Sequence, residues 1–257
     1  MPRPTIPLDE LIAYLFGAAH SALATELGPW LVVSPRFRAF AETYRDKIRK
    51  KVRGLRDDEG LRDLAFELAI AVRLLEEHRF ALEYESYGAG QRAPDFRVTF
   101  RSRVRFNVEV RRLRRPAPTP GAAADPAPLI RAVCDKLGQL PPAMVNVLAL
   151  GAEGTSSAAD LLAPAMRRLE DRAAHKDEAL FQRRGFAGTR DFLRHYQRLS
   201  GALWLAGDPR ARAASLWRNP LARHPLPADL ARALGPVAVP LTQRSRERRE
   251  LSQGDSD

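Results

Sequence analysis

The residues of this sequence that are best placed to do chemistry are two carboxylates, Asp95 and Glu109. Residues 94–100 (PDFRVTF) and 104–110 (VRFNVEV) both alternate apolar and polar side chains, which is typical of strands with one buried face. Folding the two strands about Ser102 places apolar residues opposite apolar residues, whereas a slip of one residue would oppose apolar and polar ones. In this register Asp95 faces Glu109. The apolar pairs that it predicts are Phe100 with Val104, Val98 with Phe106, and Phe96 with Val108.

Two acids at directly opposed strand positions need an explanation. Their Cβ atoms would lie about 5 Å apart, where like charges destabilise a sheet. A cation between Asp95 and Glu109 would remove that repulsion, and a hard divalent ion with oxygen ligands, such as magnesium, fits best. The alternative is that both acids are solvated on the outer face of an ordinary hairpin. The strand pair alone leaves both interpretations open.

Pro94-Asp95 followed by Glu109-Val110-Arg111 resembles the motif of the PD-(D/E)xK nuclease superfamily, which has the restriction-endonuclease-like fold. In that family a helix that carries a glutamate precedes three antiparallel strands, and a second helix and a fourth strand follow, in the order αβββαβ. The resemblance extends over about residues 62–206. It implies an α/β fold with a mixed sheet flanked by helices.

Patterns around the hairpin predict the same order of elements. Residues 61–78 have apolar side chains at helical spacing and carry Glu67 near their middle, and the apolar run 144–150 is typical of a central buried strand. Further predicted elements are a first strand at 80–87, helices at 129–140 and 158–173, and a fifth strand at 202–206.

The resemblance also implies roles for particular residues. Asp95 and Glu109 match the metal-binding acids, and Glu67 matches the helix glutamate that helps to hold or orient the metal in many members. The carbonyl of Val110 is a common further ligand. The implied cofactor is Mg²⁺ or Mn²⁺, which would polarise a phosphoryl oxygen and lower the pKa of a bound water during phosphodiester hydrolysis. For Glu67, an ordinary acid on a helix surface is an equal alternative.

The chain departs from the family motif at its last position, where Arg111 stands in place of lysine. Arg111 lies two residues after Glu109 and therefore on the same strand face, but a guanidinium does not give up its proton in proteins. Lys136, which shares a face of the following predicted helix with Gln139, could supply the missing cation. The alternative for Lys136 is a solvated lysine.

The formal net charge of +11 and the sequence pI near 10.5 predict a polyanionic partner. Basic residues gather at 45–56, 97–105 and 111–115, where they could hold the phosphate backbone of a nucleic acid, expected to be DNA. Arginines that merely solubilise the surface are the alternative. The candidate nucleic-acid-binding residues are Gln139, Arg97, Arg105, Arg112, Arg114, Arg115, Lys50 and Lys51.

Composition along the chain predicts four regions. We expect a helical extension at 1–60 with a break at 28–35 (GPWLVVSP), a nuclease-like core at 61–206, a Pro-rich extension at 207–242 with turns and one short helix, and a disordered charged tail at 243–257. The Pro/Ala-rich loop 116–128 is a candidate lid or a tolerated insertion.

Cysteine and hydropathy patterns favour a cytoplasmic protein with no membrane partner. Cys134 is the single cysteine, no apolar run reaches membrane-spanning length, and Asp9 and Glu10 precede the apolar stretch 11–24 where a signal peptide would be positive. A homodimer is a further expectation, because many enzymes of this fold dimerise. Two other functions stay open: an inactive nucleic-acid-binding module and a protein-interaction component.

Overall fold

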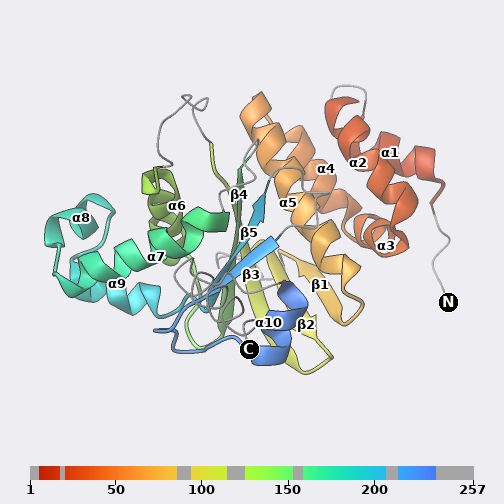
Figure 1. Ribbon diagram of the computed structural model, residues 1–257. Helices are drawn as coiled ribbons and strands as arrows, with labels where there is room; N and C mark the ends of the chain where they lie inside the picture. The colour runs from red at the N-terminus through yellow and green to blue at the C-terminus, as the bar shows by residue number, and fades with distance from the viewer. Residues whose placement is uncertain are drawn as a thin grey trace, which may run out of the picture. The chain divides into compact units, whose positions relative to one another are not determined.

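The computed structural model describes residues 6–17, 21–85, 94–114, 125–152, 159–206 and 214–235. The chain divides into two compact units, Met1–Arg112 and Leu113–Asp257, each with its own helices and strands (Figure 1). The expected tail at 243–257 and most of the expected loop at 116–128 lie outside the described residues.

The first unit begins with helices whose apolar faces pack on one another. They are α1 (Leu8–Phe16), α2 (Ser21–Val33), α3 (Pro35–Thr43), α4 (Arg45–Arg53) and α5 (Asp58–Glu76). The last of these begins earlier than residue 61, because the side chain of Asp57 accepts a hydrogen bond of 2.7 Å from the Gly60 N–H and caps the first turn.

The expected break at 28–35 is wrong in its extent. Helix α2 continues through Pro29 to Val33, and only Ser34 separates it from α3, whose N-terminus Ser34 caps by accepting from the Phe37 N–H. A proline inside a helix removes one backbone hydrogen bond. The side chains of Leu27 and Leu31 are buried on the same helix, and we attribute the continuity of α2 to this burial.

The strands of the first unit are β1 (Phe80–Tyr84), β2 (Phe96–Phe100) and β3 (Val104–Arg112), and they pair in that order, all antiparallel. The predicted hairpin register is confirmed: the partners across it are Phe96 with Val108, Val98 with Phe106, and Phe100 with Val104. Strand β1 ends at Tyr84 rather than at 87, because Glu85 turns the backbone into the left-handed region with φ of 44°. Residues 86–93 lie outside the described part of the chain.

Aromatic rings join the helices to the strands in this unit. The ring of Phe40 on α3 lies 5.7 Å from that of Tyr84 and 6.3 Å from that of Phe96, and the last two rings stack at 5.4 Å. All three side chains are buried. Such contacts add to the free energy of burial. Here they hold α3 against the last residue of β1 and the first residue of β2.

Two arginines secure the turn between α5 and β1. The guanidinium of Arg36 donates to the backbone carbonyls of Leu75 in the last turn of α5, of Glu77 just after it, and of Phe80 at the start of β1. Arg79 donates to both carboxylate oxygens of Glu77, at 2.7 and 2.6 Å. The bidentate pair holds the pKa of Glu77 down, at about 2.

The second unit places helices against strands that run in both directions. Its elements are α6 (Ala127–Leu137), β4 (Val145–Ala152), α7 (Ala159–Ala174), α8 (Glu178–Arg183), α9 (Thr189–Tyr196), β5 (Gly201–Ala206), β6 (Ala214–Arg218) and α10 (Ala228–Leu234). Strand β4 pairs parallel to β5, and β5 pairs antiparallel to β6. Helices α8 and α9 were not expected from the sequence.

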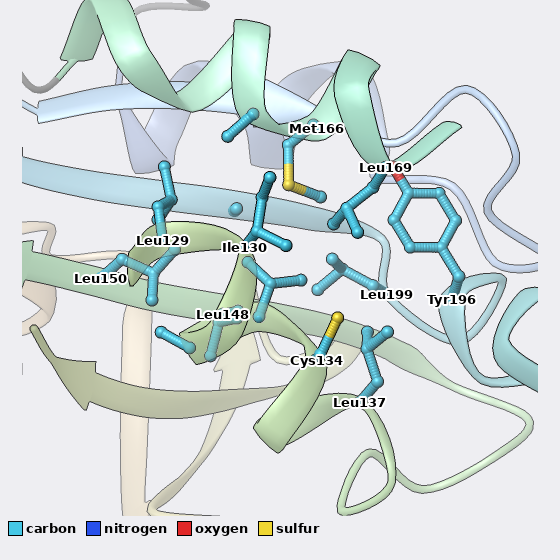
Figure 2. Close-up of a cluster of buried hydrophobic side chains, with 14 of the residues drawn as sticks. Leu129, Ile130, Cys134, Leu137, Leu148, Leu150, Met166, Leu169, Tyr196 and Leu199 are labelled. Atoms are coloured by element: carbon cyan, nitrogen blue, oxygen red, sulfur yellow. The ribbon is translucent and has the colours of Figure 1, made fainter. Parts of the chain in front are cut away.

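The core of the second unit lies between α6, α7 and the strands. Figure 2 shows Cys134 and Leu137 of α6 in one cluster with Leu148 of β4 and with Met166 and Leu169 of α7. These side chains are at most 4% exposed. Burial of apolar area of this kind contributes about 25 cal/mol for each Å² removed from water, and it is what holds α6 and α7 in place.

Strand β6 corrects the expectation of turns and one short helix at 207–242. It forms because Ala214, Leu216 and Trp217 are buried against β5. Its approach to Gly201 is close: a Cβ atom there would lie 2.8 Å from the Trp217 carbonyl oxygen and 2.5 Å from Leu226 Cδ1. Glycine is therefore required at 201. The expected short helix is α10.

The fold is of the α/β class, with a mixed sheet flanked by helices. Along the chain, α5, β1, β2, β3, α6 and β4 follow one another in the expected order αβββαβ. Among the described residues, no helix combines the length and the apolar character needed to cross a bilayer.

The Glu77–Arg79 pair predicts a pH-dependent loss of stability. Glu77→Gln should lower the free energy of unfolding at pH 7 by about 1 kcal/mol, a value discounted for partial exposure to solvent. The folded-state pKa lies below the unfolded value of about 4.3, so the contribution is fully present above that value and disappears as the pH falls through about 2. Urea unfolding between about pH 7 and pH 2 measures this.

The neighbouring acid supplies the control for this measurement. Glu76 forms an exposed ion pair with Arg73 at 3.3 Å, so Glu76→Gln should change stability by less than about 0.5 kcal/mol at every pH. A deficit for Glu77→Gln that stays constant down to pH 2 would contradict the assigned role of Glu77.

The buried thiol offers a second test of the fold. Burial raises the pKa of Cys134 to about 12, and its side chain is 4% exposed. The thiolate is the reactive form, so a thiol reagent at about pH 8 should modify Cys134 only when urea unfolds the second unit. Rapid modification in native buffer would show that the α6 packing of Figure 2 is wrong.

Candidate active site

The hairpin places Asp95 beside the end of β3, as its register predicts. The Asp95 carboxylate accepts a hydrogen bond of 2.7 Å from the backbone N–H of Val110, and the Asp95 carbonyl accepts one of 3.1 Å from Glu85. Glu109, opposite Asp95 when the ladder is continued by one residue, is 6% exposed. The alternative of two solvated acids therefore does not hold for Glu109.

The third acid comes from the middle of α5. Glu67 lies between the buried residues Phe66 and Leu68, and its side chain is only 14% exposed. Burial raises the pKa of the Glu67 carboxyl, the charge of Lys51 acts in the opposite direction, and the nearby charge of Asp95 raises the pKa further. Glu67 is thus a largely buried acid within electrostatic reach of Asp95, rather than an ordinary surface acid.

A lysine from α4 completes this group of charges. The Nζ atom of Lys51 lies 2.6 Å from Oε1 of Glu67 and 2.8 Å from Oε1 of Glu85, and 4.8 Å from the centre of the Tyr84 ring. Burial lowers the pKa of Lys51, but the two glutamates more than offset this, so the pKa is raised. Lys51 was expected to contact phosphates, and in the structure it pairs with the acids.

Helical spacing explains why α4 delivers this cation. Ile48 and Val52 are buried and fix the orientation of the helix. Lys47 and Lys51, four residues apart, share a neighbouring face that points to the end of β1. Lys47 donates to the carbonyls of Tyr84 and Glu85, both at 2.9 Å, so it supports the left-handed turn that brings Glu85 to Lys51.

The buried ring of Tyr84 forms one wall of the cluster. Burial raises the pKa of its hydroxyl, and the charge of Glu67 raises it further, so the phenol stays protonated at physiological pH. An aromatic wall lowers the local dielectric, which strengthens every charge interaction beside it. We define Glu67, Asp95, Glu109, Lys51 and Tyr84 as the carboxylate cluster.

The other expected catalytic cations are placed differently. Arg111 lies on β3, two residues after Glu109, and is half-buried. Lys136 and Gln139 belong to the second unit, where Lys136 Nζ lies 3.4 Å from Gln139 Oε1. The expected shared helix face is wrong, because α6 ends at Leu137 and Gln139 lies in the turn after it. A role of Lys136 beside the acids stays a prediction.

The expected nucleic-acid-binding residues are spread over several environments. Arg112 is buried and pairs with Asp63 at 2.8 Å and with Glu59, which anchors β3 to the first turns of α5. Arg97 lies 3.8 Å from Glu83 across the strands. Arg105, Arg114 and Lys50 are exposed, and Arg115 lies outside the described residues.

The donor chemistry of the carboxylate cluster suits a hard cation only in part. Within the described ranges, no three His, Cys, Asp or Glu side chains are grouped as ligands of one ion. Magnesium, however, is often held by one or two carboxylates and completes its shell with water and substrate phosphate. The Asp95 carboxylate accepts the Val110 N–H, and a carboxylate has about four acceptor positions. Asp95 and Glu109 are the pair that fits.

Sequence reasoning missed the roles of Lys51 and Tyr84 in this cluster. Lys51 stands sixteen residues before Glu67, and no helical or strand period relates them. The useful pattern was within α4, where the apolar spacing of Ile48 and Val52 predicts which lysines share a face.

No family model, curated protein or solved structure matches the chain.

A double-mutant cycle tests whether Lys51 and Glu67 act together. Lys51→Met should destabilise the protein by about 2 kcal/mol, because it leaves the Glu67 carboxylate buried beside Asp95 without its cation. Glu67→Gln removes the charge, so the double variant should recover about 1 kcal/mol relative to the sum of the single variants. Chemical unfolding measures all three.

The next residue along α4 provides the matched control. Lys50 is exposed, so Lys50→Met should alter stability by no more than about 0.5 kcal/mol. Additive effects of Lys51→Met and Glu67→Gln would show that the pair in the structure contributes no coupling energy.

Proposed function

We propose that the chain is a metal-dependent nuclease with a restriction-endonuclease-like fold. It hydrolyses phosphodiester bonds, and its proposed substrate is DNA. One observation carries the proposal: Asp95 lies opposite buried Glu109 and within electrostatic reach of the largely buried Glu67, which Lys51 contacts at 2.6 Å. Like charges gathered from α5, from the residue before β2 and from β3 disfavour one another unless cations accompany them. The order αβββαβ and the net charge of +11 also support the proposal.

Each residue of the cluster has a task in this proposal. Asp95 and Glu109 would hold a Mg²⁺ or Mn²⁺ ion, with Glu67 orienting them. When bound, the ion would supply Lewis-acid polarisation of a phosphoryl oxygen and a lowered pKa of water. Lys51 brings a compact ammonium, the kind of group that Arg111 does not offer, and it can stabilise negative charge that develops on phosphate oxygens.

A nucleic-acid-binding module without cleavage is the second candidate. It is favoured by the contact of Lys51 with Glu67 at 2.6 Å, because a cation of the protein already offsets part of the acidic charge. It is also favoured by Arg111 at the end of β3, because a guanidinium is a planar fork and not the compact ammonium of a lysine. On this alternative the carboxylate cluster holds α4 and α5 against the strands and does no chemistry.

A cleavage assay with Mg²⁺ or Mn²⁺ separates the two candidates. Wild type should cut single-stranded, duplex or branched DNA, and Asp95→Asn and Glu109→Gln should each lower the rate at least about a hundredfold, because each removes a charged ligand. Mn²⁺ binding by calorimetry should weaken in the same two variants. Lys51→Met should slow cleavage more than Arg111→Gln if the ammonium acts as proposed.

The matched control is Glu83→Gln, which makes the same change at an acid on β1 whose side chain is 49% exposed. It should leave cleavage and Mn²⁺ binding within about twofold of wild type. DNA binding without cutting, for every substrate and both metals, would establish the binding module instead.

A further inference from the structure

A second basic site lies on the same unit, on a different face of α4. Tyr14 of α1 and four residues of α4 line a surface pocket of about 300 Å³. The α4 residues are Asp46, Arg49, Lys50 and Arg53, whose spacing of three and four places them along one side of the helix. This side is separate from that of Lys47 and Lys51, which faces the end of β1.

One cation of the pocket, Arg49, stacks on an aromatic ring. The Arg49 guanidinium carbon lies 4.1 Å from the centre of the Tyr14 ring, and that of Arg45 lies 5.7 Å from it. Stacking on tyrosine restrains a guanidinium and leaves the edge of its fork available for hydrogen bonds. Tyr14 is itself fixed, because its hydroxyl donates to Oδ1 of Asp46 at 2.5 Å.

The charges of the pocket favour an anion. Arg49, Lys50 and Arg53 bring three positive charges, and Asp46, the acid of the lining, already accepts the Tyr14 hydroxyl. Within the part of the chain that the structure describes, none of these three cations has a carboxylate partner within ion-pair distance. The acids of the carboxylate cluster pair with Lys51 instead.

We propose that the pocket formed by Tyr14, Arg49, Lys50 and Arg53 is a phosphate-binding site that anchors the backbone of a nucleic-acid strand. Two guanidinium forks and an ammonium match the oxygens of a phosphate group. Six of the nine residues of α4 are Lys or Arg, which supplies the field that attracts a polyanion. Phosphate binding stands by itself, whereas the role of anchoring a substrate strand rests on the proposed function.

The test measures binding of a labelled DNA oligonucleotide by fluorescence anisotropy in EDTA, so that no cleavage takes place. Arg49→Gln/Arg53→Gln should lower the affinity about tenfold at about 0.1 M salt and reduce the slope of log affinity against log salt by about 2. The matched control is Arg56→Gln/Arg62→Gln, which removes the same charge from exposed positions outside the pocket and should change the affinity less than about threefold. Equal effects of the two double variants, or no binding by wild type, would overturn the proposal.

Two measurements on the wild-type chain keep the test independent of how the variants fold. Inorganic phosphate should displace the oligonucleotide at lower concentration than chloride at equal ionic strength, and equal displacement would mean diffuse attraction and no site. The oligonucleotide should also slow phenylglyoxal modification of Arg49 and Arg53 but not of Arg56, as peptide mass spectrometry would show. Uniform slowing at all three arginines would equally reject the pocket.

The two proposals fail separately. The nuclease is read from metal-dependent cleavage by Asp95→Asn and the phosphate site from binding in EDTA by Arg49→Gln/Arg53→Gln, and Asp95 lies outside the pocket lining. Pocket-dependent binding without metal-dependent cleavage would leave the phosphate site standing and reject the nuclease. Metal-dependent cleavage that is unchanged in Arg49→Gln/Arg53→Gln would support the nuclease and reject the role of the pocket in anchoring its substrate.

Discussion

The pairing of apolar side chains across the β2–β3 hairpin is the constraint on which the carboxylate cluster depends. Phe96, Val98 and Phe100 face Val108, Phe106 and Val104, and nearly all of these side chains are buried. Moving either strand by one residue would turn the apolar side chains of that strand to the opposite face. The free energy of that apolar burial therefore fixes the position of Asp95 opposite Glu109, although two acids so placed disfavour one another.

Local periodicity made the hairpin, α5 and the strand order predictable, because each depends on residues that are neighbours in sequence or meet across a short turn. Contacts between distant elements were out of reach. The pairing of Lys51 with Glu67 joins two helices. Strand β6 can form because Gly201 lets it approach β5 closely, whereas the prolines near 214–218 in the sequence favour turns. The continuity of α2 through Pro29 likewise accompanies tertiary burial of Leu27 and Leu31, and local propensity alone predicts a break.

The carboxylate cluster also shows how a cation reaches these acids from a separate element. Arg111 lies on β3, and an ammonium reaches Glu67 and Glu85 from α4. The Tyr84 ring and the side of α5 cover part of the Lys51–Glu67 contact, which strengthens the attraction but raises the cost of separating the charges. The aromatic contacts of Phe40 with Tyr84 and Phe96 hold this arrangement against the strands.

Helix α4 has three faces with three different surroundings: Ile48 and Val52 in the core, Lys47 and Lys51 toward the end of β1, and Arg49, Lys50 and Arg53 toward Tyr14. Successive residues of an α-helix are rotated by about 100° around the helix axis. Insertion or deletion of a single residue ahead of Ile48 would therefore exchange all three faces at once. A substitution in α4 changes one face of the helix at a time. A change in the number of residues between Tyr44 and Ile48 alters the surroundings of all three faces together.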